Sequence, residues 1–194
     1  MSKQTIQAAR PLRADAQKNY AHLLEVAHAV FKKKGPDASL EEIASKAKVG
    51  IGTLYRHFPT RNDLIESVYA EQIEALISRA RELRSAMPPR DALVAFIRAA
   101  AEHMMTYRAL KACLAQAGES AAKSQRQWFA RLQDEIGKLL ADGEAAGVVH
   151  RGLEPMGLIG LIHAITVVAE KSPDSARQVE VLLGIMIDGL CPRS

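Results

Sequence analysis

The sequence has few cysteines, and its apolar residues do not gather in long runs. Cys113 and Cys191 are its two cysteines, too few and too far apart for the disulfide framework of a small secreted protein. Single buried cysteines usually act as small apolar side chains that fill space in the core. A redox switch between the two cysteines is the alternative. A membrane span requires about 18 consecutive apolar residues, and no stretch of the sequence is that long. The N-terminus lacks the apolar centre of a signal peptide. We expect a cytoplasmic protein without a membrane partner.

The common motifs of catalysis, metal binding and phosphate binding are also missing. The 6 histidines form no HExxH motif and no i, i+4 pair, and the sequence has neither a GxSxG elbow nor a glycine-rich phosphate loop. Glu102 and His103 are adjacent, but a lone histidine in an apolar helix is more often structural or ligand-facing. We therefore expect no catalytic residue, no metal ligand and no cofactor, and an enzyme is the least favoured functional class.

What the sequence does have is helical periodicity. Hydrophobic residues make up 48% of the chain, enough to bury a core. They recur three and four residues apart without the alternation of strands, as at Leu23, Ala27 and Phe31. The fold class is therefore predicted to be all-α, with about nine helices. A helix around residues 93–104 is expected to be separate from a shorter one at 108–117.

Positive charge is concentrated near the N-terminus. Residues 1–61 contain 11 Lys and Arg against 5 Asp and Glu, whereas residues 62–194 contain 15 against 17. This asymmetry indicates a polyanionic partner, such as nucleic acid, that binds the first third of the chain. A solvated, lysine-rich surface is the alternative interpretation of the charge.

Two capping motifs frame a short segment in this basic region. Ser39 opens SLEE, in which the Ser39 hydroxyl is expected to cap an amide while Glu42 reaches back to the amide of Ser39. Thr60 opens a second such motif, TRND, at the start of a long helix. Between the two motifs, a short turn at residues 48–50 leads into a helix of about two turns, residues 51–58.

That two-turn helix has one apolar and one polar side. On a helical wheel, Leu54 and Phe58 share one side, whereas Tyr55, Arg56 and His57 spread over the other. A helix this short is marginal alone, so its apolar side must be held by neighbouring helices and its polar side must face outward. Two short helices joined in this way form a helix-turn-helix, whose second helix fits the major groove of DNA.

The sequence resembles the TetR family of transcriptional regulators over residues 20–64. The matching positions are Phe31, Gly35, Ser39, Ile43-Ala44, Val49, Gly52-Thr53-Leu54-Tyr55, His57-Phe58, Arg61 and Leu64. The resemblance implies a DNA-binding domain at residues 1–60, with the helix-turn-helix at 39–58, and a helical ligand-binding and dimerisation domain at 61–194. The implied function is a sequence-specific repressor that a small-molecule ligand releases from an inverted-repeat operator in double-stranded DNA. A helical interaction module without DNA binding is the alternative.

The resemblance also implies which residues meet DNA. Arg56 is the candidate for reading a guanine. Tyr55 and His57 are expected to hold phosphates, and so is Arg61. The full set of implied DNA-binding positions is Ser39, Lys48, Gly52, Thr53, Tyr55, Arg56, His57 and Arg61.

Two residues of the turn depart from the family pattern. Lys48 stands where the family commonly has Gly, and a left-handed backbone there costs a lysine about 1 kcal/mol or more. Gly50 replaces a small hydroxyl residue as the cap of the next helix, at a cost of about a few tenths of a kcal/mol. Ile51 is left open, because the helical wheel places it near the core whereas the resemblance places it toward the bases.

The C-terminal part contains two helical segments, residues 156–170 and 175–190, that are apolar over more than one narrow stripe. Such helices must be covered on several sides. The resemblance implies a homodimer through these segments, with interface candidates Leu158, Leu161, Ile165, Val181, Leu182 and Ile185. It also implies a pocket for a small apolar effector, with candidates Phe96, His103, Met104, Tyr107, Trp128 and His163. For each pocket candidate, an ordinary core position is the alternative.

Overall fold

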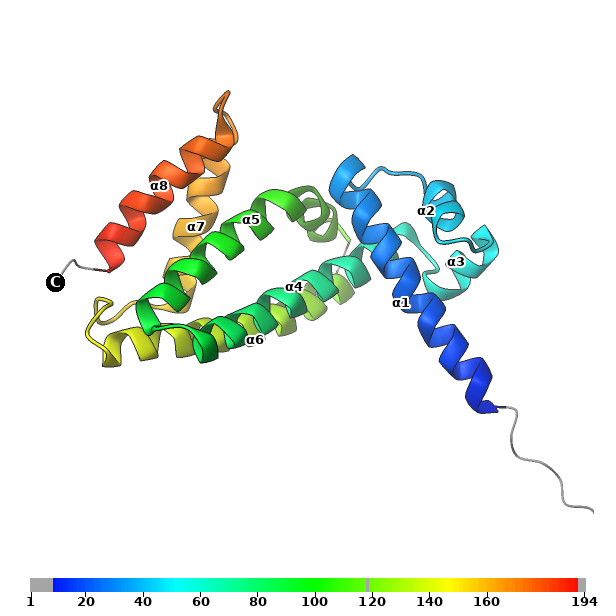
Figure 1. Ribbon diagram of the computed structural model, residues 1–194. Helices are drawn as coiled ribbons and strands as arrows, with labels where there is room; N and C mark the ends of the chain where they lie inside the picture. Colours follow the sequence, from blue (N-terminus) through cyan, green and yellow to red (C-terminus); the bar gives the residue numbers. More distant parts are fainter. Residues whose placement is uncertain (1–8, 118, 192–194) are drawn as a thin grey trace, which may run out of the picture. The chain divides into compact units, whose positions relative to one another are not determined.

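The computed structural model describes residues 9–117 and 119–191, which form eight helices and no strand. The prediction of an all-α fold is confirmed (Figure 1). The helices are α1 (Ala9–Lys34), α2 (Leu40–Lys46), α3 (Ile51–His57), α4 (Arg61–Ala86), α5 (Pro89–Ala115), α6 (Glu119–Ala145), α7 (Pro155–Ala169) and α8 (Ser175–Leu190). None of these described helices is long and apolar enough to cross a membrane.

Helix α5 corrects the predicted number of helices. The segments around 93–104 and 108–117 belong to one helix, which runs without interruption from Pro89 to Ala115. The sequence has no Pro or Gly between Arg90 and Ala117, so nothing in the backbone chemistry ends the helix at the point where its apolar pattern weakens.

The chain divides into two compact units. The first contains the described residues up to Tyr69 together with Ala109–Ala117, and the second contains Ala70–Arg108 and the described part of 118–194. The first unit extends beyond residue 60, the predicted end of the DNA-binding domain, and the first turns of α4 bury Leu64, Ile65 and Val68 in its core.

The core of the first unit is built by α1, α2 and α3. Helix α2 packs against both α1 and α3 (Figure 1). Leu23 of α1, Ile43 of α2 and Leu54 of α3 are fully buried. Burial of these three side chains stabilises the two short helices, which are too short to be stable in isolation.

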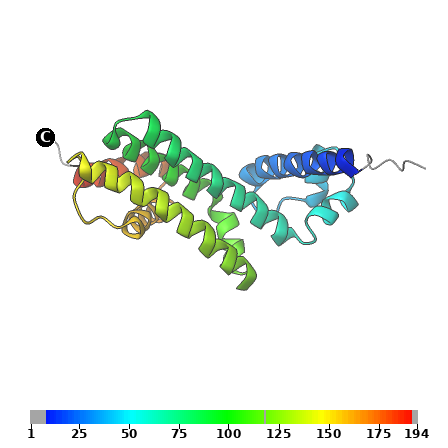
Figure 2. The same cartoon turned by 90° about the horizontal axis from the view of Figure 1, so that it is seen from below.

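In the second unit, α6 runs beside α4, as both views show (Figures 1 and 2). Arg84 Nε of α4 donates to Asp142 Oδ2 of α6 at 2.5 Å, and Arg81 Nε donates to Glu135 Oε1 at 2.9 Å. Glu135 is only 3% exposed, and burial alone would raise the pKa of its carboxyl. Hydrogen bonds from Lys138 and Arg81 outweigh burial and hold that pKa below its ordinary value. These ion pairs hold the two helices side by side.

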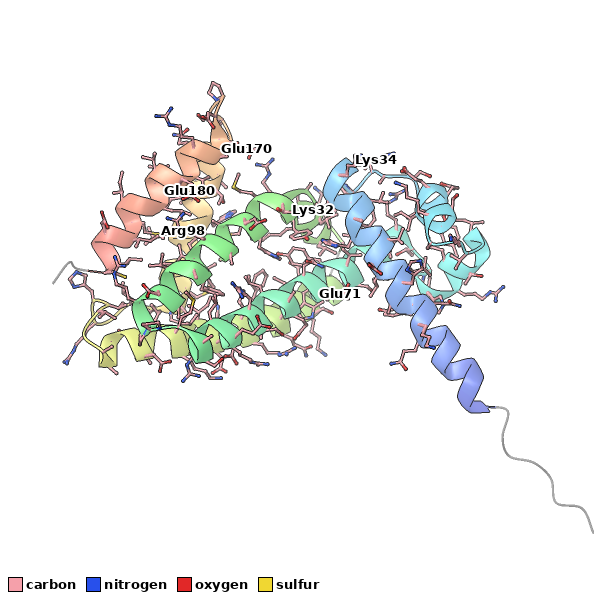
Figure 3. All side chains as sticks on the ribbon, in the orientation of Figure 1. Lys32, Lys34, Glu71, Arg98, Glu170 and Glu180 are labelled. Atoms are coloured by element: carbon pink, nitrogen blue, oxygen red, sulfur yellow. The ribbon has the colours of Figure 1, made fainter. Side chains whose placement is uncertain are left out.

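Helices α7 and α8 pack against each other and are joined to α5 by ion pairs. Arg98 of α5 pairs with Glu180 of α8, and Arg108 of α5 pairs with Glu170 at the end of α7. Figure 3 shows Arg98 and Glu180 side by side. Cys191, just after α8, is a free buried thiol, and burial raises its pKa, as expected for an apolar filler.

Candidate nucleic-acid interface

The cap of α2 forms as predicted at Ser39, but Glu42 does not complete the capping box. Ser39 Oγ accepts a hydrogen bond from the Glu42 amide at 3.1 Å and donates one to the Glu41 carboxylate at 2.7 Å. The Glu42 carboxylate lies 2.6 Å from Lys34 Nζ and 2.9 Å from Lys46 Nζ. Hydrogen bonds from these lysines lower the pKa of Glu42 to about 2. Two of the basic side chains of this unit are therefore neutralised within it.

The turn between α2 and α3 has a left-handed residue at the position where the resemblance implies a glycine. Lys48 has φ 56°, the one positive φ among the described non-glycine residues. The Lys48 amide donates to Ser45 O at 3.1 Å, and the Val49 amide donates to Ala44 O at 3.0 Å. This pair of bonds satisfies the last carbonyls of α2 and is the Schellman arrangement, in which the left-handed residue is usually glycine.

Replacing Lys48 with glycine should therefore stabilise the protein. We expect Lys48→Gly to raise the free energy of unfolding by about 0.5–1 kcal/mol, because glycine adopts this φ without strain. Urea denaturation followed by circular dichroism measures the change. Lys48→Ala is the matched control, since it removes the charge but keeps the strain, and it should give no such gain. A less stable glycine variant would show that the lysine side chain, not the backbone, determines the stability of this turn.

Helix α3 holds its apolar side inward and its polar side outward. Leu54 and the capping residue Phe58 are buried, whereas Tyr55 is 44% exposed and Arg56 is exposed. Ile51 is 38% exposed, so its side chain is not part of the core and lies on the outward side of α3. Thr53 and His57 are half-buried at the edges of the outward surface.

Glycines 50 and 52 leave the start of α3 uncovered. Gly50 caps the helix without a side-chain hydrogen bond. A Cβ atom added to either glycine would meet no atom within 4 Å. The backbone at Gly52 is therefore open to close approach by another molecule.

Tyr20 of α1 belongs to this site, although sequence reasoning missed it. Its ring centroid lies 5.1 Å from that of Phe58 and 5.9 Å from that of His57, and the latter pair is edge-on. The sequence signal was present, because Tyr20 stands three and four residues before Leu23 and Leu24 on the apolar stripe of α1. Tyr20 supports the side of the His57 ring and thereby orients the end of α3.

Arg61 has an intramolecular role that the sequence did not predict. Its Nη1 donates to Pro36 O at 2.9 Å and to Ala38 O at 2.6 Å, which ties the first residue of α4 to the loop before α2. The predicted cap of α4 forms beside it: the Thr60 amide and hydroxyl each donate to Asp63 Oδ2 at 2.8 Å. The start of α4 and the start of the helix-turn-helix are therefore joined by hydrogen bonds.

Removing the Arg61 side chain should destabilise the first unit. We expect Arg61→Ala to lower the free energy of unfolding by about 1–3 kcal/mol, because two carbonyls in a half-buried position lose a charged donor. Thermal and urea denaturation measure the loss. Arg56→Ala, an exposed arginine in the same unit, is the control and should change stability by less than about 0.5 kcal/mol. A fully stable Arg61→Ala protein would favour the predicted phosphate contact as the main role of Arg61.

The candidate pocket residues fall into two groups. Phe96 is fully buried, and Tyr107 is buried with its hydroxyl donating to Gln72 Oε1 at 3.0 Å. The ring of His103 lies 4.9 Å from that of Tyr107, and Trp128 is half-buried. Met104 and His163 instead line a cleft of about 230 Å³ in the second unit. The other residues that line this cleft are Met105, Arg108, Thr166, Glu170 and Ser175.

The predicted interface residues are divided between the core and the surface. Leu158 is 3% exposed, so it belongs to the core of its own subunit and is not available for a partner. Ile165 and Leu182 are half-buried. The remaining candidates, Leu161, Val181 and Ile185, are exposed in the single chain, as are three further apolar residues of α7. We use the name exposed apolar face for the six exposed side chains of α7 and α8, which are Met156, Leu161, Val167, Val168, Val181 and Ile185.

Comparison with known proteins identifies the family of this chain. Residues 23–68 match the family described as bacterial regulatory proteins, tetR family, and residues 88–192 match the family described as transcriptional regulator SbtR-like, C-terminal domain. The chain belongs to the TetR family. The matched residues 23–68 contain α2 and α3, and the family is one of transcriptional regulators, the class that the sequence favoured over an interaction module or an enzyme.

Solved structures of this family are similar over nearly the whole chain. A TetR transcriptional regulator from Streptomyces coelicolor is 31% identical with a TM-score of 0.73, covering 90% of this chain and 99% of that one. One from Mycobacterium vanbaalenii is 30% identical with a TM-score of 0.73, covering 93% and 99%. An HTH-type transcriptional regulator of Staphylococcus aureus is 32% identical over 74 residues, which are 38% of this chain and 40% of that relative. This chain thus matches about two fifths of the length of the Staphylococcus aureus regulator.

Proposed function

We propose that this TetR-family protein is a sequence-specific DNA-binding repressor that acts in the cytoplasm. The observation that carries the proposal is the outward side of α3. Tyr55 and Arg56 are exposed there, and the backbone at Gly52 is uncovered. A helix of this size enters the major groove, where an arginine reads base edges and neighbouring donors hold phosphates.

We further propose that the protein binds DNA as a homodimer. One short recognition helix covers few base pairs, so two copies related by a twofold axis are needed to read a longer site. The exposed apolar face of α7 and α8 supports such a pairing, because an uncovered apolar face of this kind is typical of an interaction surface. The expected operator is an inverted repeat with half-sites about one DNA turn apart.

The repressor is proposed to be released by a small-molecule effector. Helix α4 is continuous from Arg61 to Ala86, so it begins in the first unit and continues into the second. Its start is tied to the helix-turn-helix through Arg61, and Arg81 and Arg84 tie its later turns to α6. An effector that binds the DNA-free state more tightly would shift α4 and lower operator affinity.

Selection of bound fragments from the source genome tests this proposal. Fragments captured by the wild-type protein should share an inverted repeat, and the genes beside them would suggest the effector. Gly52→Glu is the matched control: the structure has room for the side chain, so the variant should fold, but the carboxylate would face the phosphates and abolish capture. If the wild type enriches no sequence, or Gly52→Glu enriches the same one, α3 is not the recognition helix.

A further inference from the structure

The cleft between α5, α7 and the start of α8 has an apolar wall and a charged wall. Met104 and Met105 of α5 supply the apolar wall. Arg108 of α5 and Glu170 of α7 both line the cleft and form an ion pair with each other. His163 and Thr166 of α7 and Ser175, the first residue of α8, add an imidazole and two hydroxyls. The cleft therefore suits a molecule with an apolar body and one polar or charged group.

The volume of the cleft limits the size of that molecule. An engineered apolar cavity of about 150 Å³ holds benzene, and drug-sized ligands occupy about 300–1,000 Å³. A cleft of about 230 Å³ falls between the two. The part of a ligand that this cleft can enclose is therefore about one aromatic ring with a small substituent.

The two members of the ion pair differ in their positions within their helices. Glu170 is the C-cap residue of α7, so its carboxylate stands at the negative end of that helix dipole. The side chains of Glu170 and Arg108 are both about half exposed, and exposed ion pairs contribute little stability. Arg108 lies within α5, away from either helix end, and its guanidinium is always charged. A ligand carboxylate can replace Glu170 on Arg108, and the displaced Glu170 then turns into solvent.

We propose that this cleft is the effector site and that its ligand is a monocyclic aromatic carboxylate. The ring contacts the two methionines, and the carboxylate takes the place of Glu170 on Arg108. This assignment rests on the proposed function, since an effector requires a regulator. The expected ligand also changes from an apolar molecule to an anionic one. A purely apolar ligand would leave the Arg108–Glu170 pair intact, whereas an anionic ligand replaces Glu170 on Arg108.

Three probes of the same size and different charge test the proposal. Benzoate, benzamide and benzylamine are titrated into the full-length wild-type protein, and binding is measured by calorimetry and by chemical-shift changes of the methionine methyl groups. Benzoate should bind at least about tenfold more tightly than the other two, because it alone forms a charge-assisted bond to Arg108. Benzoate should also weaken the binding of the selected operator fragment.

Three variants locate the binding site. Arg108→Gln should lower benzoate affinity by at least about tenfold, and Glu170→Gln should raise it by about threefold, because the internal competitor is removed. Arg98→Gln is the matched control: it breaks another ion pair of α5, with Glu180, which does not line the cleft, and should leave benzoate binding unchanged (Figure 3). Methionine shifts report binding even if a variant has altered affinity for DNA.

The possible results separate this proposal from the proposed function. Tighter binding of benzylamine, or loss of benzoate binding in Glu170→Gln, would overturn the assignment of an anionic ligand. Absence of benzoate binding in a wild type that still captures its operator would overturn the assignment of the cleft. Benzoate binding that leaves operator affinity unchanged would overturn its role as effector site. A wild type that binds benzoate through Arg108 but captures no DNA would contradict the proposed function alone.

Discussion

Replacing Ile185 with glutamate is expected to convert the protein to monomers and to weaken operator binding by about 100-fold or more, because two linked half-sites bind far more tightly than one. Ile185 is 66% exposed in the single chain, the largest exposed fraction among the large hydrophobic side chains of the exposed apolar face. In a dimer through this face, the new carboxylate would be buried without a partner, which is costly. In the monomer it would be solvated, so the subunit should still fold.

Sedimentation velocity and circular dichroism distinguish loss of dimers from loss of folding. The variant should keep the helical signal of the wild type and sediment as a monomer. Ala176→Glu, which adds the same charge at an exposed position of the same helix outside the apolar face, should remain dimeric. Leu183→Glu should instead unfold the subunit, because Leu183 is 1% exposed. A dimeric Ile185→Glu protein would place the interface on another surface.

The helix-turn-helix could be predicted because its signals are local. The caps at Ser39 and Thr60 each involve residues within three positions of one another, and both form. The left-handed residue at Lys48 was expected only from the resemblance, because the family commonly has glycine at this position. Leu54 and Phe58 are buried as the wheel indicates, since a helix this short has only one side that can pack.

Features that join distant parts of the chain could not be predicted in the same way. Arg61 donates to carbonyls of the loop before α2, and a backbone acceptor leaves no signal in the sequence. Arg108 and Glu170 line one cleft although α6 separates them in the chain. The buried carboxylate of Glu135 has a local partner in Lys138, but its partner Arg81 comes from α4, far away in the chain.

The apolar helices of the second unit show a different limit. The segment 156–170 is apolar nearly all round, so its periodicity does not tell which side is the core of the subunit. The structure buries Leu158 and Ile162 and exposes Leu161 and Val168. Sequence could therefore predict that this helix needs two partners, but not which residues face each of them.

On the recognition helix, Arg56→Ala is expected to remove base discrimination, whereas Tyr55→Phe is expected to weaken all sequences alike. Arg56 is exposed at the middle of the outward arc, where its planar group can offer two parallel donors to the N7 and O6 atoms of a guanine. We expect its loss to cost about 1–3 kcal/mol on the operator and to relax base preference at one position of each half-site. Tyr55 lies at the side of that arc, and phosphates carry no sequence information.

Titration of the wild type and both variants against the operator and a scrambled duplex, at several salt concentrations, measures this difference. The ratio of the operator affinity to the scrambled-duplex affinity should fall in Arg56→Ala and stay constant in Tyr55→Phe. The affinity of Tyr55→Phe should also keep the salt dependence of the wild type, because this variant loses no charge. His57→Ala is a less clean control, since the His57 ring also packs against Tyr20 and its removal should loosen α3. If Arg56→Ala weakens both duplexes equally, Arg56 is a phosphate contact. Base reading must then come from Thr53, Gly52 or Ile51, where the isoleucine side chain could contact only a thymine methyl.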